Sequence, residues 1–293
     1  MASLLAVSPR HLARDLALGV VVGIWSGAMG VGGGIIVIPI LVLGLHMAQK
    51  RAQATSLVMV ALAAVSGAIA YSMASRVAWP PVLVMVVGGF AGAFVGSSLV
   101  KRIPERPLQM LFGAFIIVVA VRLLFDHTPH VDSMHALPAM SVVPIMAYLA
   151  TGLAMGVLSS LLGIGGGIIV IPILVTLFGY SQQLASGTSL AVMLPIALVG
   201  AYRQTKPGYT DWPMGLRLGV GAVVGAYAGA RVALMLPGEF LRYLFAIMMI
   251  LIGARMLWGA LRRGRQVPAP MAEAALKLME PEMPGTQVDG RTS

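Results

Sequence analysis

Two glycine-rich stretches form the first pattern in this sequence that could do chemistry. One contains Gly30, Gly32, Gly33 and Gly34, and the other contains Gly163, Gly165, Gly166 and Gly167. Each interrupts an apolar region with residues that permit backbone conformations closed to other amino acids. If helices restart at Gly34 and Gly167, their free amide groups and positive dipole ends could hold an anion. The alternative is that the glycines only allow helices to pack closely. No Lys-Ser/Thr pair follows them, so they do not match a nucleotide-binding loop.

A second group of polar side chains follows each glycine-rich stretch, at the start of the next long apolar segment. The group comprises Gln53, Thr55 and Ser56 in the first instance, and Ser186, Thr188 and Ser189 in the second. Hydroxyl and amide groups at these positions could contact a polar solute. They could equally serve only to cap the N-terminus of a helix. Both interpretations stay open, and we count these residues with the glycines as candidate substrate-binding residues.

Fixed charges are scarce inside the apolar regions. No Asp or Glu occurs from Leu16 to Pro104 or from Ser133 to Thr210. Proton and cation carriers usually place an acidic residue inside the membrane, so this absence disfavours a cation as substrate. Arg217 and Arg231 are candidate cations along a path for an anion. The alternative is that these arginines only extend to the membrane interface.

Catalytic and metal-binding patterns are weak by comparison. His127, His130 and His135 lie beside Asp126 and Asp132 and could form a weak metal site, although a solvated loop is the simpler interpretation. The chain has no cysteine, which excludes a disulfide, a thiolate metal site and a cysteine nucleophile. No set of nucleophile, base and orienting residue has the spacing of a hydrolase. We therefore predict no catalytic residue, no metal site and no cofactor.

The composition is that of a membrane protein. Hydrophobic residues make up 58% of the chain and charged residues 10%, whereas about a quarter of the residues of a soluble domain are charged. The net charge of +10 lies in short clusters between apolar runs, as expected for signals that orient membrane segments. This placement argues against nucleic acid as a partner and for the lipid bilayer. Arg10 and Arg14 precede an apolar run that resembles a signal peptide, but no convincing cleavage site follows, so we expect the run to be retained.

An internal repeat organises the chain. The segment from Gly32 to Val42 recurs unchanged from Gly165 to Val175, an offset of 133 residues, and the same offset relates Thr55 to Thr188. One ungapped offset predicts two copies of a single unit. The copies occupy residues 15–125 and 148–258, with an N-terminal segment 1–14, a connector 126–147 and a tail 259–293.

Each copy contains five apolar segments, which in the first copy lie at about residues 15–31, 34–47, 53–75, 80–100 and 108–125. The second segment has only 14 residues. At about 1.5 Å per residue it covers about 21 Å, less than the roughly 30 Å hydrocarbon core. Either one long span is broken at the glycines, or a helical hairpin enters and leaves the membrane on the same side.

The positions of Lys and Arg favour the hairpin. With hairpins, the second copy is inverted and 12 of 14 flanking Lys and Arg residues lie inside, whereas a single broken span places at most 8 of them inside. We therefore predict an all-α integral membrane protein of two inverted repeats, each with about five membrane segments and a glycine-broken hairpin, and about eight full spans. Both termini are then cytoplasmic, and the connector is external. Inverted repeats with interrupted helices are a recurrent architecture of secondary transporters, so transport is the predicted function.

The paired motifs resemble a known family. The first copy reads Gly30-Val-Gly-Gly-Gly-Ile-Ile-Val-Ile-Pro39-Ile-Leu41, followed by Ala52-Gln-Ala-Thr-Ser-Leu57. The second reads Gly163-Ile-Gly-Gly-Gly-Ile-Ile-Val-Ile-Pro172-Ile-Leu174, followed by Ala185-Ser-Gly-Thr-Ser-Leu190. Together they resemble the TauE/SafE sulfite-exporter-like family over about residues 15–258. The first copy departs from the usual Gly-Thr-Ser by having Ala54.

The resemblance implies a multi-pass permease of the bacterial inner membrane, described with about eight spans and associated with export of sulfite, sulfoacetate or related sulfur-containing anions. It does not fix the substrate. We expect an exporter of a small anion that works by alternating access between the two glycine breaks. The alternatives are an ion-coupled uptake permease for a small organic or sulfur-containing acid and, from a different class, a membrane-embedded enzyme.

Overall fold

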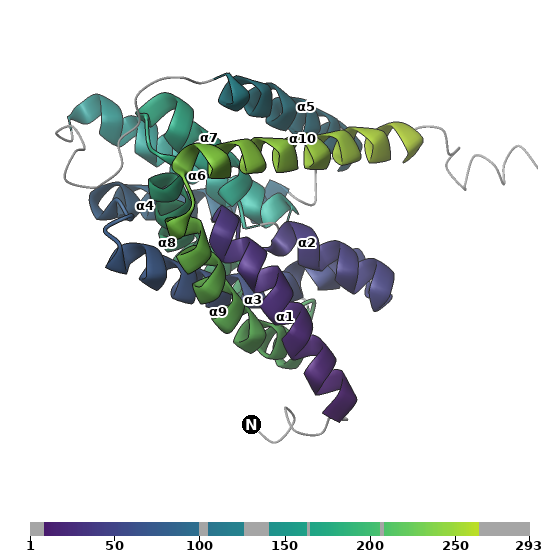
Figure 1. The fold of residues 1–293 in the computed structure, drawn as a ribbon. Helices are drawn as coiled ribbons and strands as arrows, with labels where there is room; N and C mark the ends of the chain where they lie inside the picture. The colour runs from purple at the N-terminus through teal and green to yellow at the C-terminus, as the bar shows by residue number, and fades with distance from the viewer. Residues whose placement is uncertain (1–8, 100–104, 126–140, 163–164, 206–207, 264–293) are drawn as a thin grey trace, which may run out of the picture.

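The computed structural model describes residues 9–99, 105–125, 141–162, 165–205 and 208–263, and its regular elements are helices (Figure 1). The first half contains α1 (Pro9–Met29), α2 (Gly34–Pro39) with its continuation η2 (Ile40–Gly44), α3 (Gln49–Met73), α4 (Trp79–Leu99) and α5 (Glu105–Leu124). The second half contains α6 (Val142–Leu162), α7 (Gly167–Phe178), α8 (Gln182–Thr205), α9 (Trp212–Met235) and α10 (Gly238–Arg263). Each helix of the first half begins 133 residues before a helix of the second.

Seven of these helices are long and apolar enough to cross a membrane, namely α1, α3, α4, α6, α8, α9 and α10. Helix α5 has 20 residues, but only Gly113–Leu124 counts as an apolar stretch among the described residues. It is the eighth span in the predicted count of about eight. The chain is thus a multi-pass membrane protein. Helices begin up to six residues before the predicted apolar segments, because the apolar pattern marks the membrane part of a helix and not its polar flank.

The short helix of each half turns back toward the beginning of the helix before it. In the first half, residues 45–48, which follow η2, line the same pocket as Arg14 near the start of α1. In the second half, the ring of Phe178 at the end of α7 stacks on Tyr148 near the start of α6, with 4.0 Å between ring centroids. Both units therefore have the geometry of a hairpin and not of one continuous broken span. The 12 residues of α7 cover about 18 Å at about 1.5 Å per residue.

A proline changes the course of the first hairpin. Pro39 cannot donate a backbone hydrogen bond and its ring crowds the preceding turn, and the chain continues from Ile40 to Gly44 as a π-helix. The helical segment expected at 34–47 therefore ends at Gly44, and Leu45 leaves the helix with a φ of −113°. Pro172 occupies the equivalent place in α7, which stays α-helical to Phe178.

Equivalent helices of the two halves run in opposite directions where they touch. A Cβ added at Gly67 in α3 would meet Leu190 early in α8, and one added at Gly200 late in α8 would meet Leu57 early in α3. The beginnings of α3 and α9 lie at one end of the bundle, because Arg51 Nη2 lies 3.2 Å from Asp211 Oδ2. Parallel copies would put those two residues at opposite ends. The packing agrees with inverted repeats, while the orientation in a membrane stays a prediction.

Two helix pairs pack backbone against backbone. Glycines of α1 at positions 19, 23 and 27 face α9, and those of α9 at positions 221, 225 and 229 face α1. An added Cβ at Gly225 would lie 2.1 Å from the carbonyl oxygen of Val20. The same arrangement joins α4 to α6, where Gly92 faces the carbonyl oxygen of Leu153 at 2.1 Å. These glycines, outside the breaks, allow the close helix packing that small residues permit in membranes.

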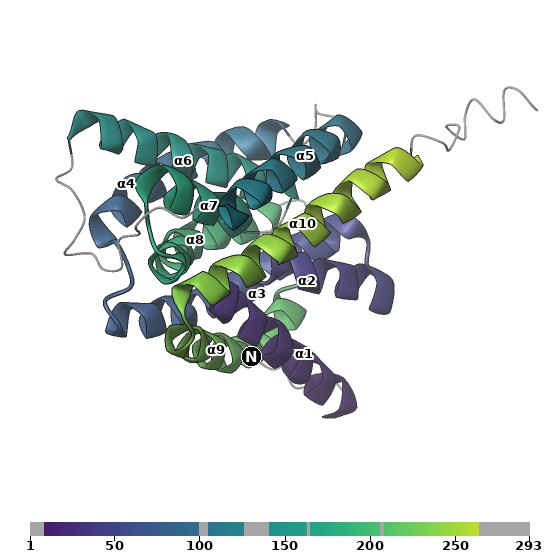
Figure 2. The same ribbon diagram turned by 45° about the horizontal axis from the view of Figure 1, so that its top comes forward.

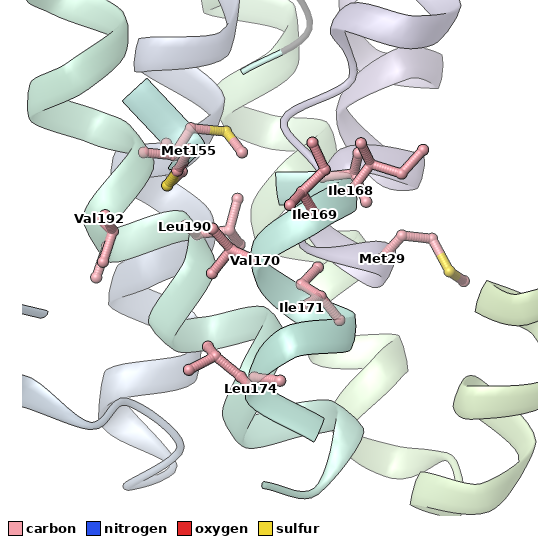
Figure 3. Packing of buried hydrophobic residues seen from close by; sticks show 14 of the residues in the cluster. Met29, Met155, Ile168, Ile169, Val170, Ile171, Leu174, Leu190 and Val192 are labelled. Carbon is pink, nitrogen blue, oxygen red and sulfur yellow. The ribbon is translucent and has the colours of Figure 1, made fainter. Parts of the chain in front are cut away.

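Helices α3 and α8 form the centre of the molecule, and α5 and α10 lie together at one side of it (Figure 1, Figure 2). Most residues of α3 and α8 are buried. Figure 3 shows apolar residues of α7 among those of its neighbours; the labelled set comprises Ile168, Ile169, Val170, Ile171 and Leu174 of α7, Met29 of α1, Met155 of α6, and Leu190 and Val192 of α8. The short helix is thus enclosed by protein, as a segment that ends within the membrane must be.

The direction of the helices predicts which positions share a side of the membrane. The chain has no cysteine, so single-cysteine variants at Lys50, Ala74 and Tyr209 each carry one reactive thiol. We expect a membrane-impermeant thiol reagent to modify Lys50→Cys and Tyr209→Cys from the same side of oriented vesicles, and Ala74→Cys from the other side. Modification of Lys50→Cys and Tyr209→Cys from opposite sides would contradict the inverted arrangement.

The close contact of α1 and α9 predicts a sharp difference between two glycine substitutions. Gly225→Leu places a side chain against the α1 backbone, whereas no atom lies within 4 Å of a Cβ added at Gly259 in α10. We expect Gly225→Leu to destabilise the protein by at least ~1–3 kcal/mol, the usual cost of overpacking, and Gly259→Leu to leave stability the same or higher. Thermal unfolding of the purified variants measures the difference. Equal melting temperatures would show that α1 and α9 do not pack as described.

Candidate functional site

Both short helices restart directly after the glycine breaks. Helix α2 begins at Gly34 and α7 at Gly167, each preceded by an N-cap glycine in the left-handed region, with φ of 73° at Gly33 and 77° at Gly166. The other glycines with positive φ in the breaks are Gly30, Gly32 and Gly165. L-residues with a Cβ rarely adopt this conformation, so the breaks require glycine. Gly163 lies outside the described residues.

The two breaks face each other in the middle of the bundle. Added Cβ atoms at Gly32 and Gly165 would meet the same two side chains, Val60 of α3 and Met193 of α8. Val60 and Met193 are equivalent in the repeat and lie at the midpoints of their helices. A Cβ at Gly167 would lie 2.7 Å from the carbonyl oxygen of Gly30. Four of the predicted glycines, Gly30, Gly32, Gly165 and Gly167, are thus brought together from both halves, about midway along the two central helices.

The carbonyl groups at the end of α1 are satisfied by side chains of α3 and α8. The hydroxyl of Tyr71 donates to the carbonyl oxygens of Gly27 at 3.1 Å and Ala28 at 3.3 Å. Ser186 Oγ donates to the Met29 carbonyl at 3.2 Å and Ser189 Oγ to the Gly30 carbonyl at 3.0 Å. A helix that ends inside a membrane needs such partners, because lipid offers none. Two of the predicted hydroxyls therefore belong to the break, and they come from the other repeat.

The two threonines hold the beginnings of distant helices. The backbone N–H of Asp211, just before α9, donates to Thr55 Oγ1 at 3.1 Å. The backbone N–H of Ala78, just before α4, donates to Thr188 Oγ1 at 3.0 Å. Both bonds cross from one repeat to the other at equivalent positions. The capping interpretation thus describes these threonines, although the helix that each one serves is neither its own nor a sequence neighbour.

The remaining members of the second motif are Ser56 and Gln53. Ser56 Oγ is buried and donates to the Gln53 carbonyl within the same helix at 2.8 Å, and Gln53 itself is half-buried. The departure of Ala54 from the motif has a packing reason. Its equivalent, Gly187, leaves no room for a Cβ, because that atom would lie 2.1 Å from the Arg76 carbonyl oxygen. Ala54 is fully buried and retains its methyl group.

The N-cap residue of each short helix is a glycine, which offers no side chain to the first amides of the helix. In the described part of the chain, no side chain caps the first turn of α2 or α7. The N–H groups of Ile36 and Val37 reach back to the Gly33 carbonyl at 3.1 and 3.0 Å, which leaves the first amides of α2 directed at the break. Unpaired amides and the positive end of the helix dipole favour an anion. The breaks are buried here, with Met193 and Val60 packed against them.

Sequence reasoning missed Ser26. Its side chain is fully buried, and its Oγ has no hydrogen-bond partner among the residues that the structure describes. It lies against the break, since a Cβ added at Gly33 would be 3.3 Å from Ser26 Cβ. A buried hydroxyl without a partner is costly, so its presence suggests a ligand. The repeat could have indicated this position, because the equivalent residue in the second copy is also a serine, Ser159. Ser159 is buried as well.

The two candidate arginines lie away from the breaks or face outward. Arg217 Nε lies 2.9 Å from Asp15 Oδ2, and the Asp15 side chain is only 1% exposed. This ion pair joins α9 to the first turns of α1, about 21 Å along the helix from Met29, so the charge of Arg217 is matched by an acid. Arg231 is exposed on α9. Asp15 itself was overlooked because it precedes the acid-free stretch by one residue.

The contrast between the two serines at the break predicts opposite effects on stability. Ser189→Ala leaves the Gly30 carbonyl without its partner, so we expect a loss of about 1 kcal/mol. Ser26→Ala removes a hydroxyl that has no partner in the described structure, so we expect no loss of stability. Thermal or denaturant unfolding of the two purified variants measures both effects. A larger loss for Ser26→Ala than for Ser189→Ala would contradict these assignments.

Comparison with known sequences places the chain among membrane transporters. It matches the model of a family described as "Sulfite exporter TauE/SafE" over residues 5–143 and 148–282. It is 23% identical over 262 residues to "Probable membrane transporter protein YunE" of Bacillus subtilis (strain 168), covering 83% of this chain and 96% of that protein. It is 26% identical over 254 residues to a "Probable membrane transporter protein" of Xylella fastidiosa (strain 9a5c), covering 85% and 96%. It is 29% identical over 226 residues to "Probable membrane transporter protein YdhB" of Bacillus subtilis (strain 168), covering 75% and 89%.

Proposed function

The chain belongs to the sulfite exporter TauE/SafE family, and on that premise we propose that it is a permease that exports a small sulfur-containing anion, such as sulfite or an organosulfonate, by alternating access. It acts in the inner membrane of a bacterial cell with both termini in the cytoplasm. The observation that carries this proposal is the pair of uncapped helix N-termini at Gly34 and Gly167, which begin at facing breaks in the middle of the bundle.

The chemistry of the breaks suits an anion. At the first break, the carbonyl groups at the end of α1 accept from the hydroxyls of Tyr71, Ser186 and Ser189, which leaves less negative partial charge there for a cation. The first amide groups of α2 and α7 follow N-cap glycines that offer them no side chain, and the Ser26 hydroxyl adds a donor on the side of α2. A sulfite or sulfonate group presents two or three oxygens that accept hydrogen bonds. Donors from two opposed helix ends and one hydroxyl match such a group.

The buried state of the breaks corresponds to a closed step of the transport cycle. Val60 and Met193 fill the space between Gly32 and Gly165, and both side chains are fully buried. Methionine is flexible and adapts to a changed cavity, so Met193 can move aside without a change of fold. In inverted-repeat transporters, access alternates when one part of the bundle moves against the other around a fixed central site. Here the hairpins α1–α2 and α6–α7 carry the two halves of that site.

The membrane potential supplies a driving force for export. An inside-negative potential contributes about 2.3 kcal/mol per charge per 100 mV, so a monoanion leaves the cytoplasm downhill at equal concentrations. Export therefore requires no coupled ion. This agrees with the absence of Asp and Glu from Leu16 to Pro104 and from Ser133 to Thr210, residues that carry the coupling proton in many transporters.

Reconstituted protein tests the proposal directly. Proteoliposomes loaded with sulfite or ethanesulfonate are expected to release the anion down its gradient, and faster when the potential favours outward movement, without a gradient of protons or sodium. Empty liposomes and an equal load of a neutral sugar are the controls. A strict requirement for a proton or sodium gradient would contradict uncoupled export and favour a coupled permease. Absence of flux for every sulfur oxyanion and sulfonate would contradict the substrate class.

The same assay tests the site through Ser26. We expect Ser26→Ala to raise KM for the anion by about tenfold, the effect of losing one hydrogen bond to a charged group. The matched control is Ser66→Ala, because Ser66 is also buried in a long helix but donates to the Ala63 carbonyl at 3.2 Å. Equal KM values for the two variants would remove Ser26 from the site.

A further inference from the structure

A pocket opens at the end of the bundle where the first hairpin returns. It has a volume of about 470 Å³ and lies between the start of α1, the residues after η2, and the beginnings of α3 and α9. Its lining residues are Arg14, Leu45, His46, Met47, Ala48, Arg51, Asp211 and Met214. Arg14 and Arg51 give the pocket two guanidinium groups, against one carboxylate from Asp211. The size exceeds that of a bare oxyanion and leaves room for a small organic group or for water.

Each guanidinium is paired with a carboxylate that has a second partner of its own. Arg14 Nη2 lies 2.9 Å from Asp15 Oδ1, while Asp15 Oδ2 is held by Arg217 at 2.9 Å. Arg51 lies 3.2 Å from Asp211 Oδ2, while Asp211 Oδ1 accepts the N–H of Met214 at 3.1 Å. If either lining arginine turns away, its carboxylate keeps a partner. A buried acid is therefore not left unpaired when the arginine takes another anion.

The two arginines are also accessible. The side chain of Arg14 is 42% exposed and that of Arg51 is 55% exposed. Ion pairs at such exposed positions contribute little to stability, so an incoming anion can compete for the guanidinium groups. Guanidinium is also the side-chain group best suited to hold two oxygens of one oxyanion.

The equivalent end of the second hairpin is entirely different. The positions of Asp15, Met47 and Arg51 are taken there by Tyr148, Tyr180 and Leu184. The hydroxyls of Tyr148 and Tyr180 lie 2.9 Å apart, and the ring of Phe178 stacks on Tyr148. Leu184 is fully buried. At the compared positions, the outer end of the first hairpin, which we call its mouth, thus has the charged residues Asp15 and Arg51, whereas the mouth of the second hairpin has Tyr148 and Leu184.

We propose that this pocket is the loading site for the exported anion, where Arg14 and Arg51 bind the oxygens of a sulfite or sulfonate group before it moves to the break at Gly33. The inference rests on the proposed function. It adds a second binding site and the side of the membrane from which the anion enters. The pocket lies at the end that holds Arg10, Arg14, Lys50 and Arg51, which the positive-inside rule assigns to the cytoplasm. Buried Val22 and Met59 pack against Gly33 beside Ser26 and belong to one apolar cluster with Leu41, so these side chains must move for an anion to reach the break.

Transport kinetics with substrate on one side test the loading site. In oriented vesicles, we expect Arg14→Gln and Arg51→Gln each to raise KM for ethanesulfonate about tenfold from the cytoplasmic side only, with kcat nearly unchanged. Arg51→Lys keeps the charge and restores part of the affinity. The matched control is Lys50→Gln, which removes an exposed cation beside Arg51 that does not line the pocket. An unchanged KM in the double variant, with active wild-type protein, would overturn the loading site and leave the proposed function intact.

A second measurement does not depend on transport. Ala48 lines the pocket of a chain that has no cysteine, so Ala48→Cys introduces a single thiol there. We expect an anionic methanethiosulfonate to modify it faster than a cationic one, and the preference to disappear when Arg14→Gln and Arg51→Gln are added. Ethanesulfonate should slow the anionic reagent. Equal rates for the two reagents in the Ala48→Cys protein would overturn the inference even if no flux is measured. Unchanged size-exclusion profiles establish that the variants are folded.

Discussion

A helix that ends halfway through a bilayer leaves backbone groups that lipid cannot satisfy, and the rest of this structure depends on how that problem is solved. The last carbonyls of α1 find hydroxyl donors on α3 and α8, from Tyr71, Ser186 and Ser189. The first amides of α2 and α7 have no side-chain cap within the described structure. Side chains of the protein thus satisfy the carbonyl groups at the end of α1, whereas the N-cap glycines offer no side chain to the amide groups at the start of α2 and α7.

The hydrogen bonds that satisfy these helix ends join the two repeats to each other. The break in the first repeat is closed by serines of the second, Thr55 holds the start of α9, and Thr188 holds the start of α4. The glycine contacts also join α1 to α9 and α4 to α6, across the repeats. Neither half has a complete set of partners within its own sequence. The contacts that hold the helix ends therefore join the two repeats into one structural unit.

The sequence predicted those features that depend on local pattern or on the repeat. The positions where helices restart, Gly34 and Gly167, follow from glycines that interrupt apolar runs. The hairpin form follows from a segment too short to cross and from the distribution of Lys and Arg. The sequence does not indicate which residues far apart along the chain bind each other. Nothing near Thr55 indicates that its hydroxyl accepts from Asp211, 156 residues away. In the same way, the sequence alone gives Arg217 no partner, whereas the structure pairs it with Asp15.

The two copies have the same sequence after the break and different side chains at the outer ends of the hairpins. Gly32 and Gly165 pack against Val60 and Met193, two residues related by the same repeat. Near such a pseudo-twofold centre, each position faces its own equivalents, so a larger side chain in either copy meets both. This constraint applies to the glycines at the start of the identical stretches Gly32–Val42 and Gly165–Val175, whereas Val60 and Met193, the equivalents that they contact, differ. The mouths of the hairpins lie far apart and do not contact each other's equivalents. At these ends, Asp15 and Arg51 of the first copy correspond to Tyr148 and Leu184 of the second. The symmetric core therefore has two ends with different chemistry.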